Sequence, residues 1–377
     1  MLNKLDQFFD LNCTSLTILV VMVFVFSYIA LPNLRNLIHK YNFKNESGTR
    51  SSHLGNVPTF GGVVFFISYL FVLICIPELR NDSDVLLIIS SFTIIFLTGF
   101  LDDLFELTPK VKMLGQLLAV GVLMFSNHFI VSSLNGVFDI YEIPFYLSIP
   151  LTALFLVFLT NAFNLIDGID GLSAITAIVI SGFYGWLFYT SEQQLYFVIS
   201  MVTIASNLAF LRFNFSKHRK IFMGDTGSLL LGMVFGLQTV VLFNTEIHLL
   251  NFSFSRSKII LILIAILFIP ILDVFRVILI RIMNKKPVFS PDRNHLHHIL
   301  IDRGYTHKVV SIMIGLYNIC IATIMFVVVQ YVSFIEALFI FIFLFLSSMV
   351  VLFVLNKNRS AILRKLKIIK TINSFKF

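Results

Sequence analysis

Residues 85–103 read VLLIISSFTIIFLTGFLDD, a largely apolar run that ends in the adjacent carboxylates of Asp102 and Asp103. As a helix, a run of this length is enough to cross the hydrocarbon layer of a membrane. A carboxylate near the bilayer centre costs about 2.5–3.5 kcal/mol on insertion scales, so ionisable residues at the edge of such a run indicate function. The stretch therefore predicts a transmembrane helix with a polar site at one end.

Apolar runs of the same kind occupy most of the chain. Of its 377 residues 58% are hydrophobic and the mean hydropathy is +0.92, whereas soluble domains are nearer half apolar. We predict an all-α, polytopic integral membrane bundle with about 11 transmembrane helices. The expected spans are 14–31, 60–77, 85–101, 111–127, 144–162, 169–190, 195–211, 226–243, 258–280, 308–330 and 333–355.

The 28 Lys and Arg residues are distributed unevenly between the two sides of this bundle. Because cytoplasmic loops carry the excess of cations, the N-terminus is predicted outside and the C-terminus in the cytoplasm. We expect one membrane domain over 1–355 and a basic cytoplasmic tail over 356–377 that lies on anionic lipid head groups. The tail lacks interleaved aromatic residues, so nucleic-acid binding is not expected. The loops of the other side hold only Lys4, Arg80, Arg256 and Lys258.

The Asp pair is followed by a second candidate group in the same loop region. Pro109 opens the next expected helix, and Lys112 lies near its start, where a cation suits a phosphate. Adjacent helical residues point about 100° apart, so Asp102 and Asp103 can share one site only near a helix end. One carboxylate could then hold a metal while the other accepts a proton. The alternative is a plain loop with surface ion pairs.

Residues 161–171 read NAFNLIDGIDG and form a second polar motif. Asn161 and Asn164, and likewise Asp167 and Asp170, are three residues apart, so each pair shares one helix face. Amides with carboxylates suit a nucleotide and a hydrated Mg²⁺. A polar seam between packed helices is the alternative.

Two further motifs fall in loops of the same side. Residues 222–228 read FMGDTGS, in which Asp225 is either a metal ligand on a glycine-flanked turn or only a helix N-cap. Phe222 either stacks on a base or packs internally. Residues 291–298 read PDRNHLHH, and their donors favour an anion clamp over zinc because the sequence has no second Cys or His cluster. The donors are Arg293, His295, His297 and His298.

In this order the four motifs resemble those of the polyprenyl-phosphate N-acetylhexosamine-1-phosphate transferases. That superfamily includes the phospho-MurNAc-pentapeptide translocases and the enzymes that start O-antigen, enterobacterial common antigen and teichoic acid synthesis. The resemblance implies a glycosyl-1-phosphate transferase in the bacterial cytoplasmic membrane, with its active site on the cytoplasmic face. The implied cofactor is Mg²⁺, with Mn²⁺ able to substitute. The implied substrates are a UDP-N-acetylhexosamine and undecaprenyl phosphate, with UMP released in the first membrane step of envelope polysaccharide synthesis.

The resemblance also implies roles for the residues that match the family motifs. Asp102, Asp103 and Asp225 are the implied catalytic residues, with the Asp pair near the lipid phosphate. Asp225, Asp103 and Asn164 are the implied metal ligands. The implied substrate-binding residues are Lys112, Asn164, Asp167, Asp170, Phe222, Arg293, His295, His297 and His298, of which Phe222 matches the residue that stacks on uracil in the muramyl branch.

The sequence favours the branch that transfers GlcNAc 1-phosphate. Residues 291–295 are like those of that branch, and Glu106 stands where the muramyl branch usually has a basic residue. A phospho-MurNAc-pentapeptide transferase is the alternative. An ion-coupled transporter fits less well, because the carboxylates lie at helix ends and no repeat is visible. The sequence leaves open the N-acetylhexosamine, the polymer, a direct or aspartyl-phosphate route, and whether a homodimer forms.

Overall fold

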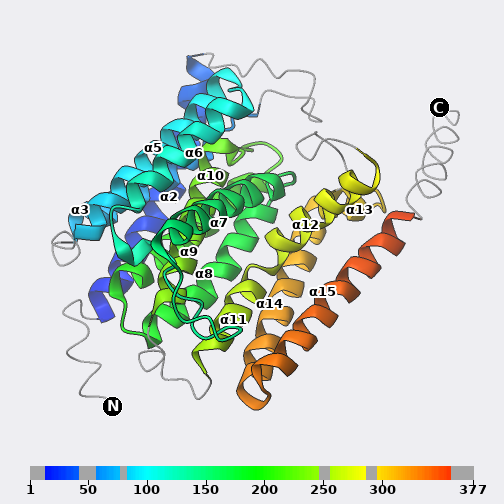
Figure 1. Ribbon diagram of the computed structural model, residues 1–377. Coiled ribbons are helices and arrows are strands. Elements are labelled where there is room, and N and C mark those ends of the chain that lie inside the picture. The colour runs from blue at the N-terminus through cyan, green and yellow to red at the C-terminus, as the bar shows by residue number, and fades with distance from the viewer. Residues whose placement is uncertain (1–12, 42–56, 77–82, 246–254, 286–294, 358–377) are drawn as a thin grey trace, which may run out of the picture.

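The computed structural model describes residues 13–41, 57–76, 83–245, 255–285 and 295–357, which form helices and no β-strand (Figure 1). Two short 3-10 turns, η1 (Asn127–Phe129) and η3 (Arg256–Lys258), accompany the α-helices. The α-helices are α2 (Cys13–Lys40), α3 (Gly61–Cys75), α5 (Ser83–Phe105), α6 (Pro109–Leu123), α7 (Phe145–Ile166), α8 (Leu172–Thr190), α9 (Gln194–Asn214), α10 (Gly224–Asn244), α11 (Ile259–Ile266), α12 (Phe268–Met283), α13 (Leu296–Ile301), α14 (His307–Tyr331) and α15 (Phe334–Lys357).

Helix α10 lies at the centre of the bundle. Every residue from Thr226 to Phe243 is buried, and the helix packs against α3, α5 and α7. Two glycines permit the close contact with α7. A Cβ at Gly232 would lie 2.5 Å from the Cα of Thr160, and one at Gly236 would lie 2.8 Å from a methyl carbon of Leu156. Small residues of this kind let membrane helices approach closely, so α10 and the residues that begin it are held firmly in place.

Helices at the edge of the bundle expose their apolar side chains. In both α2 and α15 only 17% of the most apolar 18-residue window is buried. Such a surface is expected where a helix faces lipid. Within the described residues, eight helices are long and apolar enough to cross a membrane. The chain is therefore a multi-pass membrane protein, which confirms the predicted fold class.

Every predicted span coincides with a helix or a helix pair, but not every one of these helices meets the length and hydropathy expected of a span. Counting α11 and α12 as one span raises the number from eight to nine within the described residues. Helix α3 is apolar, but its 15 residues are fewer than the about 20 that a membrane-spanning helix needs. Helix α6 also has 15 residues and carries two lysines in its first turn. The number of about 11 spans therefore stays a prediction, and so does the orientation of the bundle in the membrane.

The predicted span 258–280 is broken in the structure. Helices α11 and α12 are bent by 73° at Leu267. Pro270, in the first turn of α12, has no N–H to donate to the carbonyl of Ile266. Instead the side-chain amide of Asn318, on α14, donates to that carbonyl over 3.0 Å, and its oxygen accepts from the N–H of Ile269 over 3.3 Å. The break is thus stabilised by a residue far away in the sequence.

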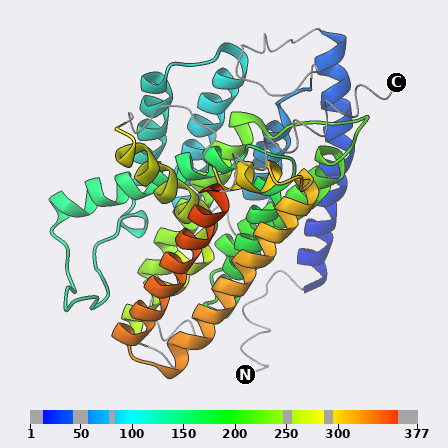
Figure 2. The same ribbon diagram turned by 90° about the vertical axis from the view of Figure 1, so that its right-hand side faces the viewer.

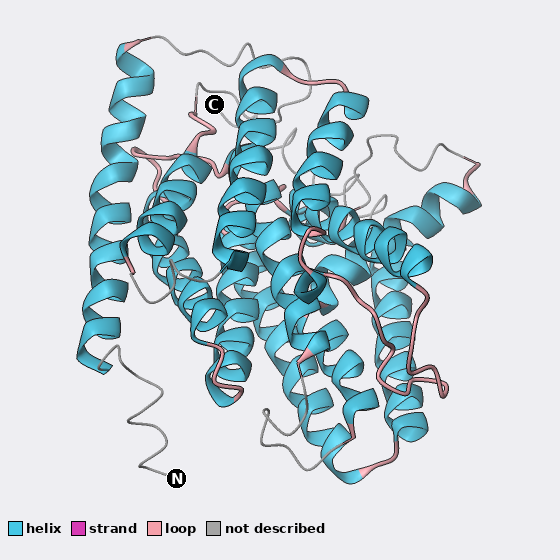
Figure 3. Cartoon of the chain, turned by 60° about the vertical axis from the view of Figure 1, so that its left-hand side comes forward, coloured by secondary structure: helices cyan, strands magenta, loops and turns pink. Residues whose placement is uncertain are grey.

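Most of the long helices stand side by side with loops at their ends, as α14 and α15 do in Figure 2, and Figure 3 shows several upright helices with others running across them. Near one end of the bundle, Arg303 donates to the carbonyl of Leu355 over 2.8 Å. Near the opposite end, Lys258 donates to the carbonyls of Val329 and Val332 over 2.9 and 2.6 Å. The loop after α5, the loop after α7 and the loop before α10 all lie at the first of these ends, where the polar motifs meet.

Candidate active site

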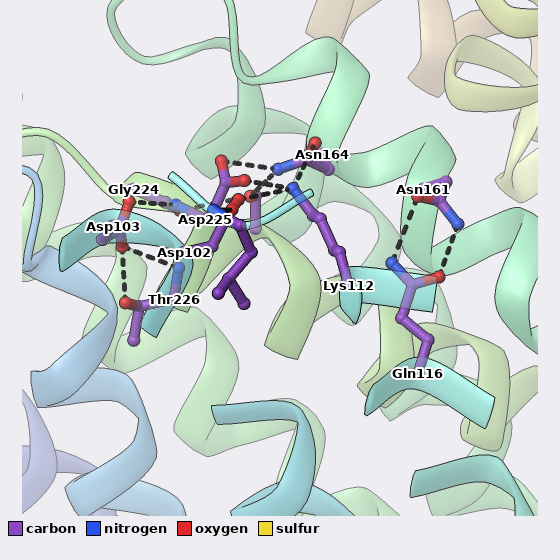
Figure 4. A network of polar contacts seen from close by, with 11 residues as sticks. Asp102, Asp103, Lys112, Gln116, Asn161, Asn164, Gly224, Asp225 and Thr226 are labelled. Carbon is purple, nitrogen blue, oxygen red and sulfur yellow. Dashed lines mark hydrogen bonds and ion pairs between the residues drawn. The ribbon is translucent and has the colours of Figure 1, made fainter. Parts of the chain in front are cut away.

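Four helix ends bring the motif residues together (Figure 4). Asp102 and Asp103 lie in the last turn of α5, and Lys112 lies in the first turn of α6. Asn164 belongs to the last turn of α7, and Asp225 to the first turn of α10. Segments far apart in the sequence thus meet at one end of the bundle.

The ammonium group of Lys112 is the centre of this cluster. It donates to Oδ2 of Asp102 over 3.0 Å, lies 3.5 Å from Oδ1 of Asn164 and pairs with Oδ2 of Asp225. The side chain of Lys112 is 16% exposed and that of Asp102 is 13% exposed. Partly buried charges of this kind need their partners, because removal of one leaves the other uncompensated.

Asn161 and Asn164 separate into two different roles. The amide of Asn164 donates to Oδ1 of Asp225 over 2.8 Å and to the hydroxyl of Ser228 over 2.9 Å. The side-chain amide of Asn161 instead accepts a hydrogen bond from that of Gln116, on α6, over 3.2 Å and donates one to it over 2.7 Å. Asn164 therefore faces the cluster, whereas Asn161 belongs to a polar seam between α6 and α7. Sequence spacing placed both on one face and did not distinguish them.

The carboxylate of Asp103 holds the N-terminus of α10. Its Oδ1 accepts from the backbone N–H of Asp225 over 2.9 Å. Its Oδ2 accepts from the backbone N–H and the hydroxyl of Thr226, over 2.9 and 2.5 Å. These backbone groups have no partner within the helix, so the carboxylate supplies the cap from another element. The interpretation of Asp225 as an N-cap is wrong, because α10 begins at Gly224 and Asp225 lies inside its first turn.

Glycines let the backbone come very close around this N-terminus. Gly224 has a φ of +72°, and a Cβ there would lie 1.8 Å from the carbonyl oxygen of Thr59. A Cβ at Gly62 would lie 2.1 Å from the backbone nitrogen of Gly227, and one at Gly99 would lie 2.6 Å from the carbonyl oxygen of Asp225. Gly62 and Gly99 were not singled out from the sequence, because nothing local shows which backbone a glycine will meet.

Asp167 lies beside the cluster without a bonding partner. It is half-buried and makes no side-chain hydrogen bond or ion pair with the described residues. Burial, and to a lesser extent the negative charges of Asp225, Asp103 and Asp170, together raise the pKa of Asp167 to about 8. Asp167 is therefore largely protonated near neutral pH, and it is free to interact with a ligand.

Asp170 is tied to a lysine and a histidine instead. Its Oδ2 accepts from Nζ of Lys220 over 2.7 Å and lies 3.0 Å from Nδ1 of His307. Burial alone would raise the pKa of Asp170, but the bonds to His307 and Lys220 bring it below its ordinary value. The same lysine lies 5.1 Å from the centroid of the Phe222 ring. His307 carried no signal in the sequence, since it stands alone at the start of α14.

The HxHH motif lies next to the loop that contains Asp167. A Cβ at Gly168 would lie 2.3 Å from Nε2 of His297, so the missing side chain makes room for the imidazole. His297 is 1% exposed. Its pKa is lowered to about 3, mainly by burial, so the imidazole is neutral at physiological pH. His298 lies with its ring centroid 4.4 Å from that of His297. Arg293 lies outside the described residues.

A buried aspartate on α12 anchors the start of this motif. Asp273 is 1% exposed and accepts from the N–H of Leu296 over 2.7 Å, while its other oxygen lies 2.8 Å from Nδ1 of His295. A carboxylate partner of this kind fixes the orientation and tautomer of a histidine ring. Asp273 was missed in the sequence analysis, although a lone carboxylate inside the span 258–280 is a signal of the kind that drew attention to Asp102.

The donor set of the cluster fits a hard divalent cation. Oxygens of Asp102, Asn164 and Asp225 converge on a single positive charge, the ammonium of Lys112. Mg²⁺ in proteins takes oxygen ligands, usually one or two carboxylates together with phosphate and water. No three Asp, Glu, His or Cys side chains form a metal cage in the part of the chain that the structure describes. A site completed by phosphate oxygens is therefore the kind that these residues can build.

Known proteins are similar to this chain over most of its length. Residues 85–243 match the model of the family described as glycosyl transferase family 4. A probable undecaprenyl-phosphate N-acetylglucosaminyl 1-phosphate transferase of Bacillus subtilis (strain 168) is 30% identical over 309 residues, 79% of this chain and 81% of the relative. A decaprenyl-phosphate N-acetylglucosaminephosphotransferase of Mycobacterium leprae is 30% identical over 329 residues, 82% and 81%. An undecaprenyl-phosphate alpha-N-acetylglucosaminyl 1-phosphate transferase of Escherichia coli (strain K12) is 25% identical over 320 residues, 83% and 84%.

The fold and the cluster define a multi-pass membrane protein with a charged site at one end of its helices. With its matches to the Bacillus and Mycobacterium proteins, the chain belongs to glycosyl transferase family 4, alongside the polyprenyl-phosphate N-acetylglucosaminyl 1-phosphate transferases. This confirms the family and the transferase class that the motifs predicted. The muramyl and transporter alternatives are not favoured.

Proposed function

We propose that the protein transfers N-acetylglucosamine 1-phosphate from UDP-N-acetylglucosamine to undecaprenyl phosphate and releases UMP. The observation that carries this proposal is the convergence of Asp102, Lys112 and Asp225 from three helices at one point. Relatives of nearly the same length are named for the transfer of this sugar phosphate to a polyprenyl phosphate. A cation between carboxylates at a helix end suits a reaction between two phosphate groups.

The reaction moves the sugar phosphate from UMP to the lipid phosphate. An oxygen of the lipid phosphate attacks the phosphorus that carries the sugar, the bond from this phosphorus to the bridging oxygen breaks, and UMP leaves with that oxygen. Lys112 binds a phosphate oxygen and offsets the negative charge that gathers during the exchange. In such transfers most of the acceleration comes from positioning and charge stabilisation.

Asp102 is placed to act on the acceptor. Its Oδ2 is bonded to Lys112, and its Oδ1 accepts from the N–H of Leu107 over 2.7 Å, which fixes the carboxylate. A phosphate monoester has a second pKa of about 6, so only a fraction of the acceptor needs to lose a proton near neutral pH. Asp102 can take that proton, but we assign its larger contribution to orienting Lys112.

Mg²⁺ fits the other side of the cluster, and Asp225 with Asn164 would hold it. When bound, it would neutralise the diphosphate of the donor and stabilise the leaving UMP. We assign Asp103 a different role from that of a metal ligand, because its two oxygens accept from backbone N–H groups that begin α10. The partners of Asp225 are side chains, which can move aside for a metal. Asp103 would position Asp225 for the metal.

The donor would lie against the loops that follow α7 and precede α10. Asp167 has no partner among the described residues, and Phe222 is half-buried beside Lys220. His297 packs its buried, neutral ring against Gly168, so it would support the loop that contacts the donor. We propose that the protein lies in a bacterial inner membrane and that the site opens to the cytoplasm. The loops around the site are those with most of the cations, and such loops are cytoplasmic.

The proposal is tested with purified protein in liposomes that contain undecaprenyl phosphate. UMP release and the mass of the lipid product are measured with UDP-GlcNAc, UDP-GalNAc and UDP-MurNAc-pentapeptide as donors. We expect product from UDP-GlcNAc only when both lipid phosphate and Mg²⁺ are present, and its loss on chelation. Folded protein that gives no product with any donor would contradict the proposal.

The same protein, reconstituted in liposomes without undecaprenyl phosphate, separates the two chemical routes. Labelled UMP is incubated with UDP-GlcNAc and Mg²⁺ in the absence of lipid phosphate. Exchange of label into UDP-GlcNAc indicates an aspartyl-phosphate, because only a covalent intermediate would return the sugar phosphate to UMP. Direct attack predicts no exchange until the lipid is added.

A further inference from the structure

A cationic cavity lies apart from the cluster, where α2 meets the loop between α9 and α10. It has a volume of about 330 Å³, and no motif residue lines it. Its described lining has two guanidinium groups and two side-chain amides but no carboxylate, a composition that suits an anion. The lining residues are Pro32, Asn33, Arg35 and Asn36 of α2 and Arg219 of the loop.

Arg35 is only partly satisfied by the protein around it. One terminal nitrogen donates to the backbone carbonyl of His218 over 3.2 Å, which joins α2 to the loop. Its Nε is buried and makes no hydrogen bond to the residues that the structure describes. A buried donor left unpaired is costly, and an anion oxygen in the cavity would satisfy it. Arg219, on the facing loop, is exposed and supplies the second guanidinium.

An apolar stripe on α2 leads to this cavity. Val25, Tyr28 and Ile29 are 46%, 44% and 55% exposed. They stand three and four residues apart, and the same spacing continues to Pro32 and Asn36, so all five share one helix face. In a protein that spans a membrane, this face contacts acyl chains. The cavity therefore opens beside a surface that faces acyl chains, and a lipid would place its chains along this stripe and its head group in the cavity.

We propose that this cavity binds the phosphate of an anionic membrane lipid, with the acyl chains lying along α2. Held between Arg35 and Arg219, the phosphate would fix the loop between α9 and α10. That loop also carries Lys220, which pairs with Asp170 over 2.7 Å, and it leads directly into the first turn of α10. The lipid would thereby order the loop that borders the active site without taking part in the reaction.

The test measures binding directly, so it does not depend on the proposed reaction. Full-length protein is extracted from vesicles of phosphatidylcholine with phosphatidylglycerol, and retained lipid is counted by native mass spectrometry. We expect wild type to retain phosphatidylglycerol in preference to phosphatidylcholine. Arg35→Ala and Arg219→Ala should each weaken retention about tenfold, the loss of one good charged contact. Lys217→Ala removes a positive charge from the same loop without touching the cavity, and should retain lipid as wild type does.

Two controls keep the outcome decisive. Thermal unfolding shows that each variant is folded, and phosphatidylglycerol should raise the melting temperature of wild type and of Lys217→Ala but not of Arg35→Ala. An excess of inorganic phosphate should fail to reproduce that rise. Equal retention by wild type and both arginine variants would overturn the proposal. Inorganic phosphate that stabilises as well as the lipid does would overturn the lipid assignment and indicate a soluble anion.

Discussion

Asp102 and Asp103 are neighbours in the sequence but act on different parts of the molecule. Asp102 bonds to Lys112, whose ammonium lies among the oxygens of the cluster. Asp103 bonds to the backbone of Asp225 and Thr226. Asp102 thus contacts the charged group of the site, whereas Asp103 holds α10, the helix that carries Asp225. The two carboxylates should therefore respond differently to the same substitution.

Asp103→Asn should damage both stability and activity. Its side-chain amide would set an N–H₂ group against backbone N–H donors, which leaves a buried donor unpaired at a cost of about 1–3 kcal/mol. Asp102→Asn keeps an acceptor for Leu107, and Asp225 still compensates the charge of Lys112, so this variant should lose less stability than Asp103→Asn while UMP release slows about 100-fold or more. Melting temperature and turnover are measured on the same samples. Equal loss of stability in the two variants would contradict this division of roles.

Asp167 makes stability depend on pH. Its pKa is raised to about 8 by burial and by neighbouring carboxylates, against 3.8 for an unperturbed group. Between these two values the native state holds a proton that the unfolded state has lost, so native stability falls as the pH rises from about 4 to about 8. Asp167→Asn removes this proton and should flatten the decline.

The measurement is the melting temperature of wild type and Asp167→Asn across that pH range, in one detergent. The melting temperature of Asp167→Asn relative to that of wild type should rise steadily with pH up to about pH 8, the raised pKa of Asp167. Glu142→Gln is the matched control, since Glu142 is exposed, and its curve should run parallel to that of wild type. Parallel curves for Asp167→Asn as well would show that Asp167 is ionised in the native protein.

Sequence motifs predicted which residues belong at the site, but not what each one contacts. Asn164, Lys112 and Asp225 meet as their chemistry suggested. The pairing of Asp170 with His307, and of His295 with Asp273, could not be foreseen, because each partner lies far away in the sequence and outside the motifs. Their proximity results from helix packing over long sequence distances, which no local spacing records.

At the scale of elements, the first turn of α10 depends on backbone contact with α3 and α5. The N–H groups of Gly61 and Gly62 donate to the carbonyls of Phe222 and Met223 over 2.9 and 3.0 Å. Gly62 also faces the backbone of Gly227 with no room for a side chain. Asp225 is thus positioned by α3 and α5 together, and a shift of α3 should disturb it.

Gly62→Ala should therefore abolish activity and lower stability. Its Cβ would lie 2.1 Å from a backbone nitrogen, and a backbone atom in a central helix cannot move aside easily. Gly182→Ala is the control, because a Cβ there meets nothing within 4 Å. In the middle of α8 that change should be neutral or stabilise by about 0.5–1 kcal/mol. An active, stable Gly62→Ala protein would show that the close approach is not required.

The broken helix shows what hydropathy cannot resolve at this scale. Residues 258–280 read as one apolar span, yet the chain bends by 73° at Leu267. Pro270 alone allows either a kink or a break. The choice is made by Asn318, which bonds to the two backbone groups that the break would expose. After the bend, α12 carries Asp273, the residue that holds His295 beside the site.

At the scale of the whole molecule, composition and apolar runs were sufficient for the fold class. A central helix that is buried throughout and edge helices that face lipid are what a membrane bundle of this length requires. The number of passes is harder to predict, because α3 and α6 are short and their place in the membrane depends on their neighbours. The cavity beside Arg35 had no sequence signal, since its lining is split between α2 and a distant loop.

The most direct measurement is UMP release by wild type and by Asp225→Asn, reconstituted side by side in liposomes with undecaprenyl phosphate. Among the described residues, Asp225 is the carboxylate that contacts both Lys112 and Asn164. Lys112 keeps Asp102 as a partner in the neutral variant, which should therefore fold and turn over at least about 100-fold more slowly. Wild type should release UMP from UDP-GlcNAc only with the lipid phosphate and Mg²⁺ present. Unchanged turnover in folded Asp225→Asn would contradict the account, because the reaction would then not take place where these helix ends meet.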